Sequence, residues 1–217
     1  KYYLTKNKSE VDYYKRRADR LLAKATPLME IYCEKQVRAY RSFLQADAET
    51  PGSRHFILSA LSCYTATEEL IDRILVRNRI PQKEQEQILA YIAGQREMMD
   101  KILLHSSVTE EIPALGREEF EQFPMRLSLS GMFYEKDIFY TWEEYQEHLE
   151  QIRAYRKMHP GYTVTENTIS AFRNIQIYIH EKKWVMVSKN KAPAIHFLIQ
   201  HPKMQSAFEN MVIPIVE

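Results

Sequence analysis

Glycine and cysteine are scarce in this sequence, and each shortage excludes a class of protein. Five glycines occur among 217 residues, and none lie close together. Phosphate-binding loops need clustered glycines because their backbone approaches the phosphate closely, so neither a P-loop nor a dinucleotide-binding fold is expected. The two cysteines, Cys33 and Cys63, lack the spacing of paired metal or redox motifs. We interpret them as reduced, buried thiols in preference to a redox or metal role.

Long apolar runs and an excess of one charge are also missing. No stretch approaches the ~20 apolar residues of a membrane span, and no signal peptide opens the chain. We therefore expect a cytoplasmic protein with no membrane partner. Thirty basic and 29 acidic side chains leave a net charge of +1. Because a DNA-binding surface usually brings an excess of Lys and Arg, we expect no direct nucleic acid binding by this chain.

Residues 9–105 carry the period of amphipathic helices. We predict a first helix that opens with a capping box formed by Ser9 and Asp12. This helix should kink or break near Pro27, since proline cannot complete the helical hydrogen-bond ladder. Its apolar residues recur at alternating steps of three and four along one stripe, which comprises Val11, Tyr14, Ala18, Leu21, Ala25, Leu28 and Tyr32.

A loop over residues 47–54 separates this helix from two more. Pro81 suits the first position of the third helix, which should end near His105. The second helix should place five apolar residues on its buried side, namely Ile57, Leu61, Tyr64, Ile71 and Leu75. The pattern predicts an antiparallel helical bundle region over residues 1–108.

From residue 109 onward, strand and helix patterns are mixed. Thr141 and Glu144 form a capping box that should open a helix, and Pro202 should open the last helix. Alternating residues predict strands at 125–132, 138–140, 174–180, 184–189 and 194–199. The whole chain is therefore predicted to have an α+β fold, with the helical bundle followed, over residues 109–217, by a largely antiparallel sheet with flanking helices. The two regions can also pack together as one domain.

The stretch "WVMVSKNKAPAIHFLIQHP" (184–202) should supply two adjacent strands, joined by a loop over 190–193. Strand side chains alternate between faces. Trp184, Met186 and Ser188 should therefore share one face, and Val185, Val187 and Lys189 the other. Ile195, Phe197 and Ile199 should face the core, which leaves His196 on the opposite face beside Ser188.

Polar residues of this sheet are the candidate ligand-binding site. They would line a cleft against the helical half, where an otherwise apolar pocket needs a few convergent polar groups. The competing interpretation is a sheet face turned to water. His196 in particular can be a buried structural residue, a ligand contact or a metal ligand. The candidates are Asn174, Gln176, Tyr178, Ser188 and His196, with Lys189 as an anion-attracting group.

Three sequence features resemble motifs of known chemistry. "HPK" at 201–203 resembles the HxK of phospholipase D-type phosphoryl transfer, but Phe208 stands where that pattern has an aspartate. His180, His196 and His201 have no carboxylate or cysteine at a metal-ligand spacing. Residues 67–92 have the outline of a helix-turn-helix, yet their second helix opens with "PQKEQEQ", which is poor in base-reading side chains. We assign no catalytic residue, no metal ligand and no cofactor.

The C-terminal stretch "FRNIQIYIHEKKWVMVSKNKAPAIHFLIQHPKMQSAFENMVIPIVE" (172–217) resembles the end of clostridial transcriptional regulators of the Cro/repressor helix-turn-helix kind, and "RADRLLAKATPLMEIY" (17–32) is similar to a lesser degree. The resemblance implies a helical segment and an α+β region that senses a signal or mediates assembly. It implies no catalytic residues. The DNA-reading module of that family is absent here, and the chain starts with Lys1 instead of methionine, so we expect the regulatory portion without its reader.

Two functions follow from these patterns. The leading hypothesis is a non-enzymatic effector-sensing or oligomerisation portion of a bacterial transcriptional regulator, with a small-molecule effector and a homodimeric state. The dimer is expected because the stripe from Val11 to Tyr32 has heptad-like steps, and the competing interpretation is that the stripe packs only on later helices of the same chain. The alternative is a small hydrolase or transferase that uses His196 or His201 with a nearby carboxylate.

Overall fold

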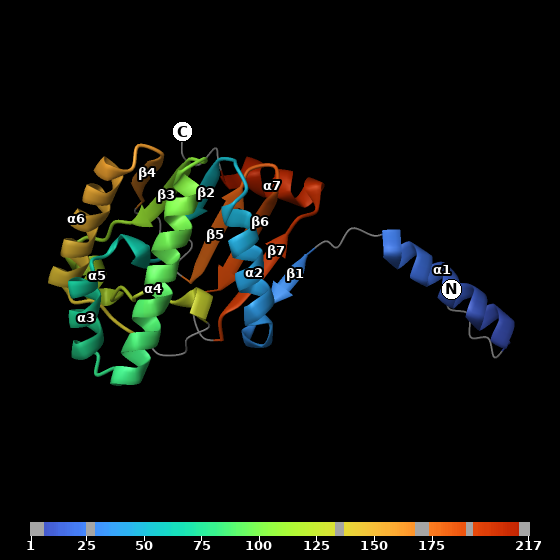
Figure 1. The fold of residues 1–217 in the computed structure, drawn as a ribbon, viewed down its shortest axis with the longest axis horizontal. Helices are drawn as coiled ribbons and strands as arrows, with labels where there is room; N and C mark the ends of the chain where they lie inside the picture. The colour runs from blue at the N-terminus through green and yellow to red at the C-terminus, as the bar shows by residue number, and fades with distance from the viewer. Residues whose placement is uncertain (1–6, 25–28, 133–136, 168–173, 190–192, 213–217) are drawn as a thin grey trace.

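The computed structural model describes residues 7–24, 29–132, 137–167, 174–189 and 193–212. A seven-stranded sheet with the order β1-β7-β6-β5-β2-β3-β4 runs through its body (Figure 1). The strands are β1 Glu30–Tyr32, β2 Arg54–Ile57, β3 Val108–Pro113, β4 Tyr162–Asn167, β5 Ile175–His180, β6 Trp184–Lys189 and β7 Ile195–Ile199. The helices are α1 Lys8–Lys24, α2 Val37–Ala48, α3 Glu68–Arg77, α4 Gln82–Leu103, α5 Arg117–Gln122, α6 Trp142–Met158 and α7 Pro202–Val212.

The sheet is mixed but mostly antiparallel, which confirms the predicted α+β class. Strands β1, β7, β6, β5 and β2 pair antiparallel in turn, whereas β2–β3 and β3–β4 pair parallel. Parallel neighbours need a crossover connection. Here α3 and α4 lie between β2 and β3 in the chain, and α5 and α6 lie between β3 and β4.

Helices cover both faces of the central strands. On the face seen in Figure 1, α2 packs on Trp184 and Met186, and α4 lies beside it. On the opposite face, Met204 and Phe208 of α7 pack on Val185 and its neighbours. The central strands are therefore buried on both sides.

Two strands fall where the sequence predicted helix or loop. Ile57 ends β2, and the segment after it forms a 3-10 helix at Cys63–Thr65 before α3 begins at Glu68. The prediction that one helix carries Ile57, Leu61 and Tyr64 is therefore wrong, although these residues are buried as expected. Through β1 and β2, residues before 108 share one sheet with strands of the C-terminal region.

The first helix also differs from its prediction. Asn7, and not Ser9, caps α1, because its side-chain oxygen accepts from the Ser9 backbone at 3.1 Å. The helix is described as far as Lys24, and Tyr32 belongs to strand β1. The kink expected near Pro27 lies outside the described residues.

The second half follows the prediction in part, since strands β3 and β4 and helix α5 were not predicted. The Thr141–Glu144 capping box opens α6, and β5, β6, β7 and α7 lie where alternation and Pro202 placed them. Segments 125–132 and 138–140 meet through a single bridge, Arg126 to Phe139, so the strands expected there are wrong. Their alternation still has a meaning, since Met125, Leu127 and Leu129 are all buried.

The two faces of β6 and β7 were predicted with one error. Trp184 and Met186 share the α2 face, and Val185 and Val187 the α7 face, as expected. In β7, however, Ile195 and Phe197 are half-buried, while His196 and Leu198 are fully buried. The expectation that Ile195, Phe197 and Ile199 face the core is therefore wrong for Ile195 and Phe197. The α2 side is the better covered side of this strand.

Candidate functional site

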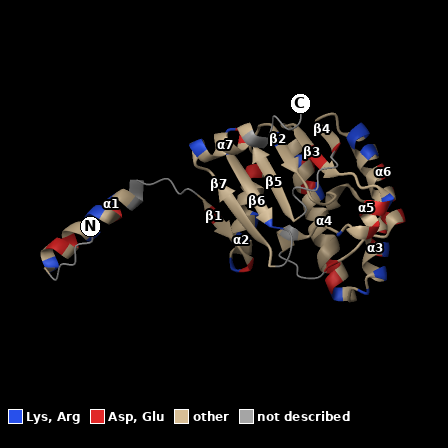
Figure 2. Cartoon of the chain, turned by 180° about the vertical axis from the view of Figure 1, so that it is seen from behind, with Lys and Arg blue, Asp and Glu red and all other residues tan. Residues whose placement is uncertain are grey.

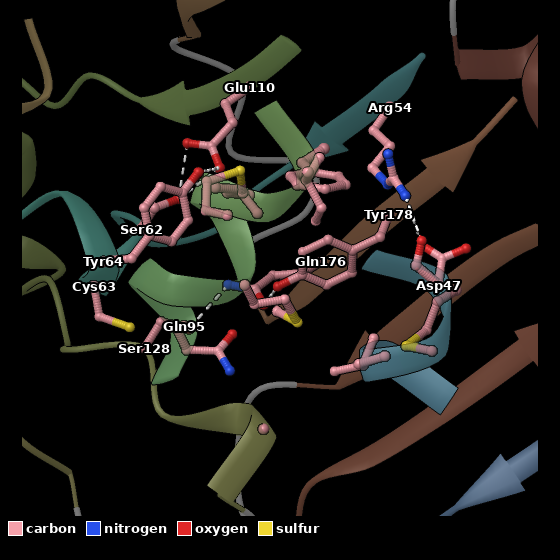
Figure 3. Close-up of a pocket in the computed structure, with 18 of the residues that line it drawn as sticks. Asp47, Arg54, Ser62, Cys63, Tyr64, Gln95, Glu110, Ser128, Gln176 and Tyr178 are labelled. Carbon is pink, nitrogen blue, oxygen red and sulfur yellow. Dashed lines mark hydrogen bonds and ion pairs between the residues drawn. The ribbon is translucent and has the colours of Figure 1, made fainter. Parts of the chain in front are cut away.

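A cavity of about 100 Å³ lies between α2, α4 and the central strands. Figure 3 shows its polar groups arriving from several elements, with Gln176 and Tyr178 at the centre, Glu110 at one end and Asp47 at the other. Most of the wall is apolar or aromatic, and it includes Leu44, Phe56, Leu58, Leu61, Tyr91, Met98, Met99, Ile102, Trp184 and Met186.

Strand alternation explains why these residues meet. Gln176 and Tyr178 of β5 are two residues apart, so both side chains point to the α4 side of the sheet. Their neighbours Ile177 and Ile179 point to the α7 side and pack there. Trp184 and Met186 repeat this pattern in β6 and lie opposite His180 and Tyr178 in the ladder. One hairpin thus supplies the floor of the cavity.

Glu110 is the acidic end of the cavity. It is 0% exposed, and its carboxyl accepts hydrogen bonds from Ser62 at 2.9 and 2.8 Å, from Tyr162 at 2.6 Å and from Tyr64. Burial raises the pKa of Glu110, and the three hydroxyl groups only partly offset that effect. Burial, together with the adjacent Glu110, also raises the pKa values of Tyr64 and Tyr162, so both phenols keep their protons and donate.

Asp47 organises the other end. Its carboxylate accepts from Trp184 at 2.7 Å, from His180 at 2.8 Å and from Arg54 at 3.1 Å. Burial by itself would raise the pKa of Asp47, but the hydrogen bonds from His180 and Trp184 and the charges of His180 and Arg54 outweigh it and lower that pKa. The His180 ring also contacts the Pro51 carbonyl at 3.3 Å, so both of its nitrogens face acceptors.

A third polar group crosses the middle of the cavity. The Tyr178 hydroxyl donates to the Gln176 side-chain oxygen, and the Gln176 amide donates to Ser128 at 3.1 Å. Ser128 and Gly131 reach the cavity from the segment before α6. The side chains of Tyr178, Gln176 and Ser128 are all neutral, so these hydrogen bonds can be exchanged for bonds to a ligand without a large electrostatic cost.

The six predicted site residues do not form one group. Gln176 and Tyr178 line the cavity. Ser188 and His196 are fully buried beside each other, where the Ser188 hydroxyl lies 2.8 Å from His196 Nδ1, and His196 stacks on Tyr40 at a centroid distance of 4.3 Å. Asn174 is exposed just before β5, and the Lys189 amine donates to the Pro193 carbonyl at 3.1 Å. Four of the six predicted residues therefore lie outside the cavity wall, namely Asn174, Ser188, Lys189 and His196.

Burial of His196 leads to a stability prediction. His196→Ala removes the stacking contact with Tyr40 and leaves the buried Ser188 hydroxyl without this partner. We expect a loss of about 1–3 kcal/mol and a fall in melting temperature of several degrees, because unsatisfied buried polar groups are costly. Calorimetry of the parent and variant measures the shift. The exposed His105 offers a control, and His105→Ala should change the melting temperature little. Equal effects of the two substitutions would contradict the structural role of His196.

The sequence interpretation missed Glu110, Asp47 and Arg54. A usable signal existed for Glu110, since "VTEEIP" places two acids inside a strand-like segment where both turn out to be buried. No comparable signal marks Asp47, whose partner His180 lies 133 residues away in the chain.

Among the described residues, no group of three or more His, Cys, Asp or Glu side chains is arranged to hold a metal ion. Within the same residues, every helix is too short or too polar to cross a bilayer.

Comparisons with known proteins add little. No protein-family model matches the chain, and no curated protein matches it. One solved structure with a detectable likeness is TrmBL2, an archaeal chromatin protein described as having a novel mode of DNA binding. The match has 9% sequence identity and a TM-score of 0.36, and it covers 94% of this chain and 61% of that chain. At this level, the likeness assigns neither a fold family nor a function.

Proposed function

We propose that this chain is a non-enzymatic effector-binding portion of a bacterial transcriptional regulator, and that the cavity between α2, α4 and the sheet is its effector site. The composition of the cavity wall carries the proposal. A mainly apolar and aromatic wall with a few convergent polar groups, here Gln176, Tyr178 and Ser128, is typical of small-molecule sites.

The charges around the cavity favour an uncharged effector. Asp47 is already paired with Arg54 and His180, and Glu110 is held by three hydroxyl groups. An ionic ligand would lose its hydration on entry without gaining a strong new counter-ion, and that loss is expensive in a largely apolar site. We infer that the effector is a small, mainly apolar molecule that carries neutral hydrogen-bonding groups.

The charge distribution supports a function that does not involve DNA binding. Figure 2 shows Lys and Arg interspersed with Asp and Glu along the helices, and the whole chain has a net charge of +1. The helix pair over residues 67–92, which has the outline of a helix-turn-helix, buries Leu70, Ile71 and Ile74 in the main core. We therefore assign effector binding, and no DNA contact, to this chain.

The enzyme alternative receives less support from the geometry. His196 contacts Ser188 and stacks on Tyr40, and neither of these partners is a carboxylate. Three His–carboxylate contacts occur among the described residues, namely His55–Glu111 at 2.7 Å, His180–Asp47 at 2.8 Å and His159–Asp100 at 3.9 Å. The His180 side chain is 0% exposed in its pair, and both of its ring nitrogens already face acceptors. It is therefore poorly placed to exchange protons with a substrate.

A matched set of probes tests the proposal. Phenol, benzoate and benzylamine have similar shapes but are neutral, anionic and cationic at neutral pH. An apolar cavity of ~150 Å³ holds benzene, so a ring of that size must displace flexible side chains here, such as those of Met98 and Met99. We expect phenol to raise the melting temperature in a saturable way and the two ions to have little effect. Calorimetric titration should give the same ranking.

Substitutions at methionine supply the control. Met98→Trp fills the cavity and should abolish the phenol-dependent shift, since Met98 lines the wall. Met158→Trp makes the same chemical change at an exposed position at the end of α6 and should leave the shift intact. If phenol has no effect on the parent, or an equal effect on Met98→Trp, the cavity is not the site. If benzoate or benzylamine binds best, the inference of an uncharged effector is wrong.

A further inference from the structure

Helix α1 stands apart from the other elements in Figure 1. The apolar stripe along this helix is open to solvent. Val11, Tyr14 and Leu21 are 46%, 60% and 64% exposed. Singly exposed apolar residues are ordinary, but these follow the steps of three and four that bring side chains to one face of a helix. Ala18 completes the stripe within the described helix and is also exposed.

A helix of this kind needs something to pack on. Isolated helices of about 12–15 residues are only marginally stable in water, and most helical stability in proteins comes from burial of an apolar face. Helix α1 has 17 residues, contains no internal glycine or proline, and leaves its apolar face exposed. The missing partner must therefore present a complementary apolar stripe.

We propose that α1 pairs with α1 of a second copy of this chain, in a parallel, in-register, two-stranded coiled coil. The stripe has the 3.5-residue average spacing of a heptad seam, with Val11 and Ala18 at the a positions and Tyr14 and Leu21 at the d positions. A second copy matches this spacing by construction. The inference rests on α1 alone and stands whether or not the cavity binds an effector.

The flanking charges select both the partner and its direction. In this register, Glu10 and Arg17 occupy g positions, and Lys15 occupies an e position. In a parallel pair, a g residue faces the e residue of the next heptad on the other helix, so Glu10 faces Lys15 of the second copy, twice. An antiparallel pair about the helix centre would instead bring Lys15 against Lys15 and Arg17 against Arg17. Attraction in the first arrangement and repulsion in the second favour the parallel one.

Adjacent tyrosines provide a matched test of the pairing. Tyr14 lies in the seam, whereas Tyr13 lies beside it and is similarly exposed, at 54%. We expect sedimentation equilibrium of the full chain, from about 1 to about 100 μM, to show a reversible dimer of twice the 25.8 kDa monomer mass. Tyr14→Glu should weaken the dimer at least about tenfold, while Tyr13→Glu should not. A parent that remains monomeric throughout, or equal effects of the two substitutions, would overturn the proposal.

Two further variants test the direction of pairing. Ala18→Cys places a thiol at an a position, where two parallel in-register helices bring the same residue close enough for a disulfide. We expect mild oxidation to cross-link this variant but not the parent, which retains Cys33 and Cys63. Glu10→Lys should weaken the dimer, and the double variant Glu10→Lys, Lys15→Glu should restore it. A dimer that fails to cross-link and is not restored by the charge swap would refute the parallel arrangement.

Discussion

Replacing Asp47 by alanine should be among the most destabilising single changes in this chain. The substitution removes the common acceptor of Arg54, His180 and Trp184, and it leaves two basic groups buried without their counter-ion. Removal of one partner from a buried ion pair costs about 3–5 kcal/mol. At about 2–4 °C per kcal/mol for a chain of this size, the melting temperature should fall by about 10 °C. Chemical denaturation of both proteins at neutral pH measures the free energy difference.

An exposed ion pair supplies the control for Asp47. Arg126 and Asp137 are 3.0 Å apart, with side chains 37% and 46% exposed. Because exposed pairs contribute at most about 1 kcal/mol, Asp137→Ala should change stability little.

The contribution of Asp47 to the free energy of unfolding also depends on pH. Its pKa is lowered by folding, so its contribution is present above the unfolded value of 3.8 and is lost as the pH falls through the folded value. The gap between parent and Asp47→Ala should therefore narrow in acid, and a gap that is equally wide there would contradict this role.

The elements that sequence patterns located are those whose signal is local. The Thr141–Glu144 capping box and Pro202 mark helix starts within four residues, and both predictions are confirmed. The alternation in β5 and β6 extends over six residues in each strand, long enough to be distinguished from a helix. Strands β1 and β2 have three and four residues, too few for any period to be read, and β2 is buried throughout. Their places in the sheet come from pairing partners far away in the chain.

The same reasoning explains which parts of the candidate site were found. Gln176 and Tyr178 were chosen because they alternate with isoleucines in one strand, and they line the cavity. Ser188 and His196 were paired correctly, yet the cover that α2 provides through Tyr40 could not be seen from the sequence. Asp47 meets Trp184 across 137 residues, and Glu110 meets Ser62 across 48. Such contacts follow from the order of the strands, which the residues of one segment do not specify.

Glu110 should show the opposite pH dependence to Asp47. Because burial raises its pKa, the folded state favours the protonated carboxyl, and this contribution is lost as the pH rises from the unfolded value of 4.5 through the folded value. Glu110→Gln keeps the shape and remains neutral at all pH values. Its amide oxygen can accept from a hydroxyl group, and its amide nitrogen can donate to one. We expect the parent to lose stability relative to Glu110→Gln as the pH rises above the unfolded value of 4.5.

Glu110→Ala separates the charge of this residue from its hydrogen bonds. The truncation leaves Ser62, Tyr64 and Tyr162 without their acceptor and enlarges the cavity, so Glu110→Ala should be about 2–4 kcal/mol less stable than Glu110→Gln at any pH. Urea denaturation of the three proteins across the pH range distinguishes the two effects. If the free energies of unfolding of the parent and Glu110→Gln change in parallel with pH, then Glu110 does not titrate over the measured pH range. Equal losses for the Gln and Ala variants would show that the three hydroxyl groups do not depend on an acceptor at this position. The expected result is the same pH dependence for both differences from the parent, because neither variant titrates at this position. Glu110→Ala should lie below Glu110→Gln by a constant amount, because only Gln keeps hydrogen bonds to the hydroxyl groups.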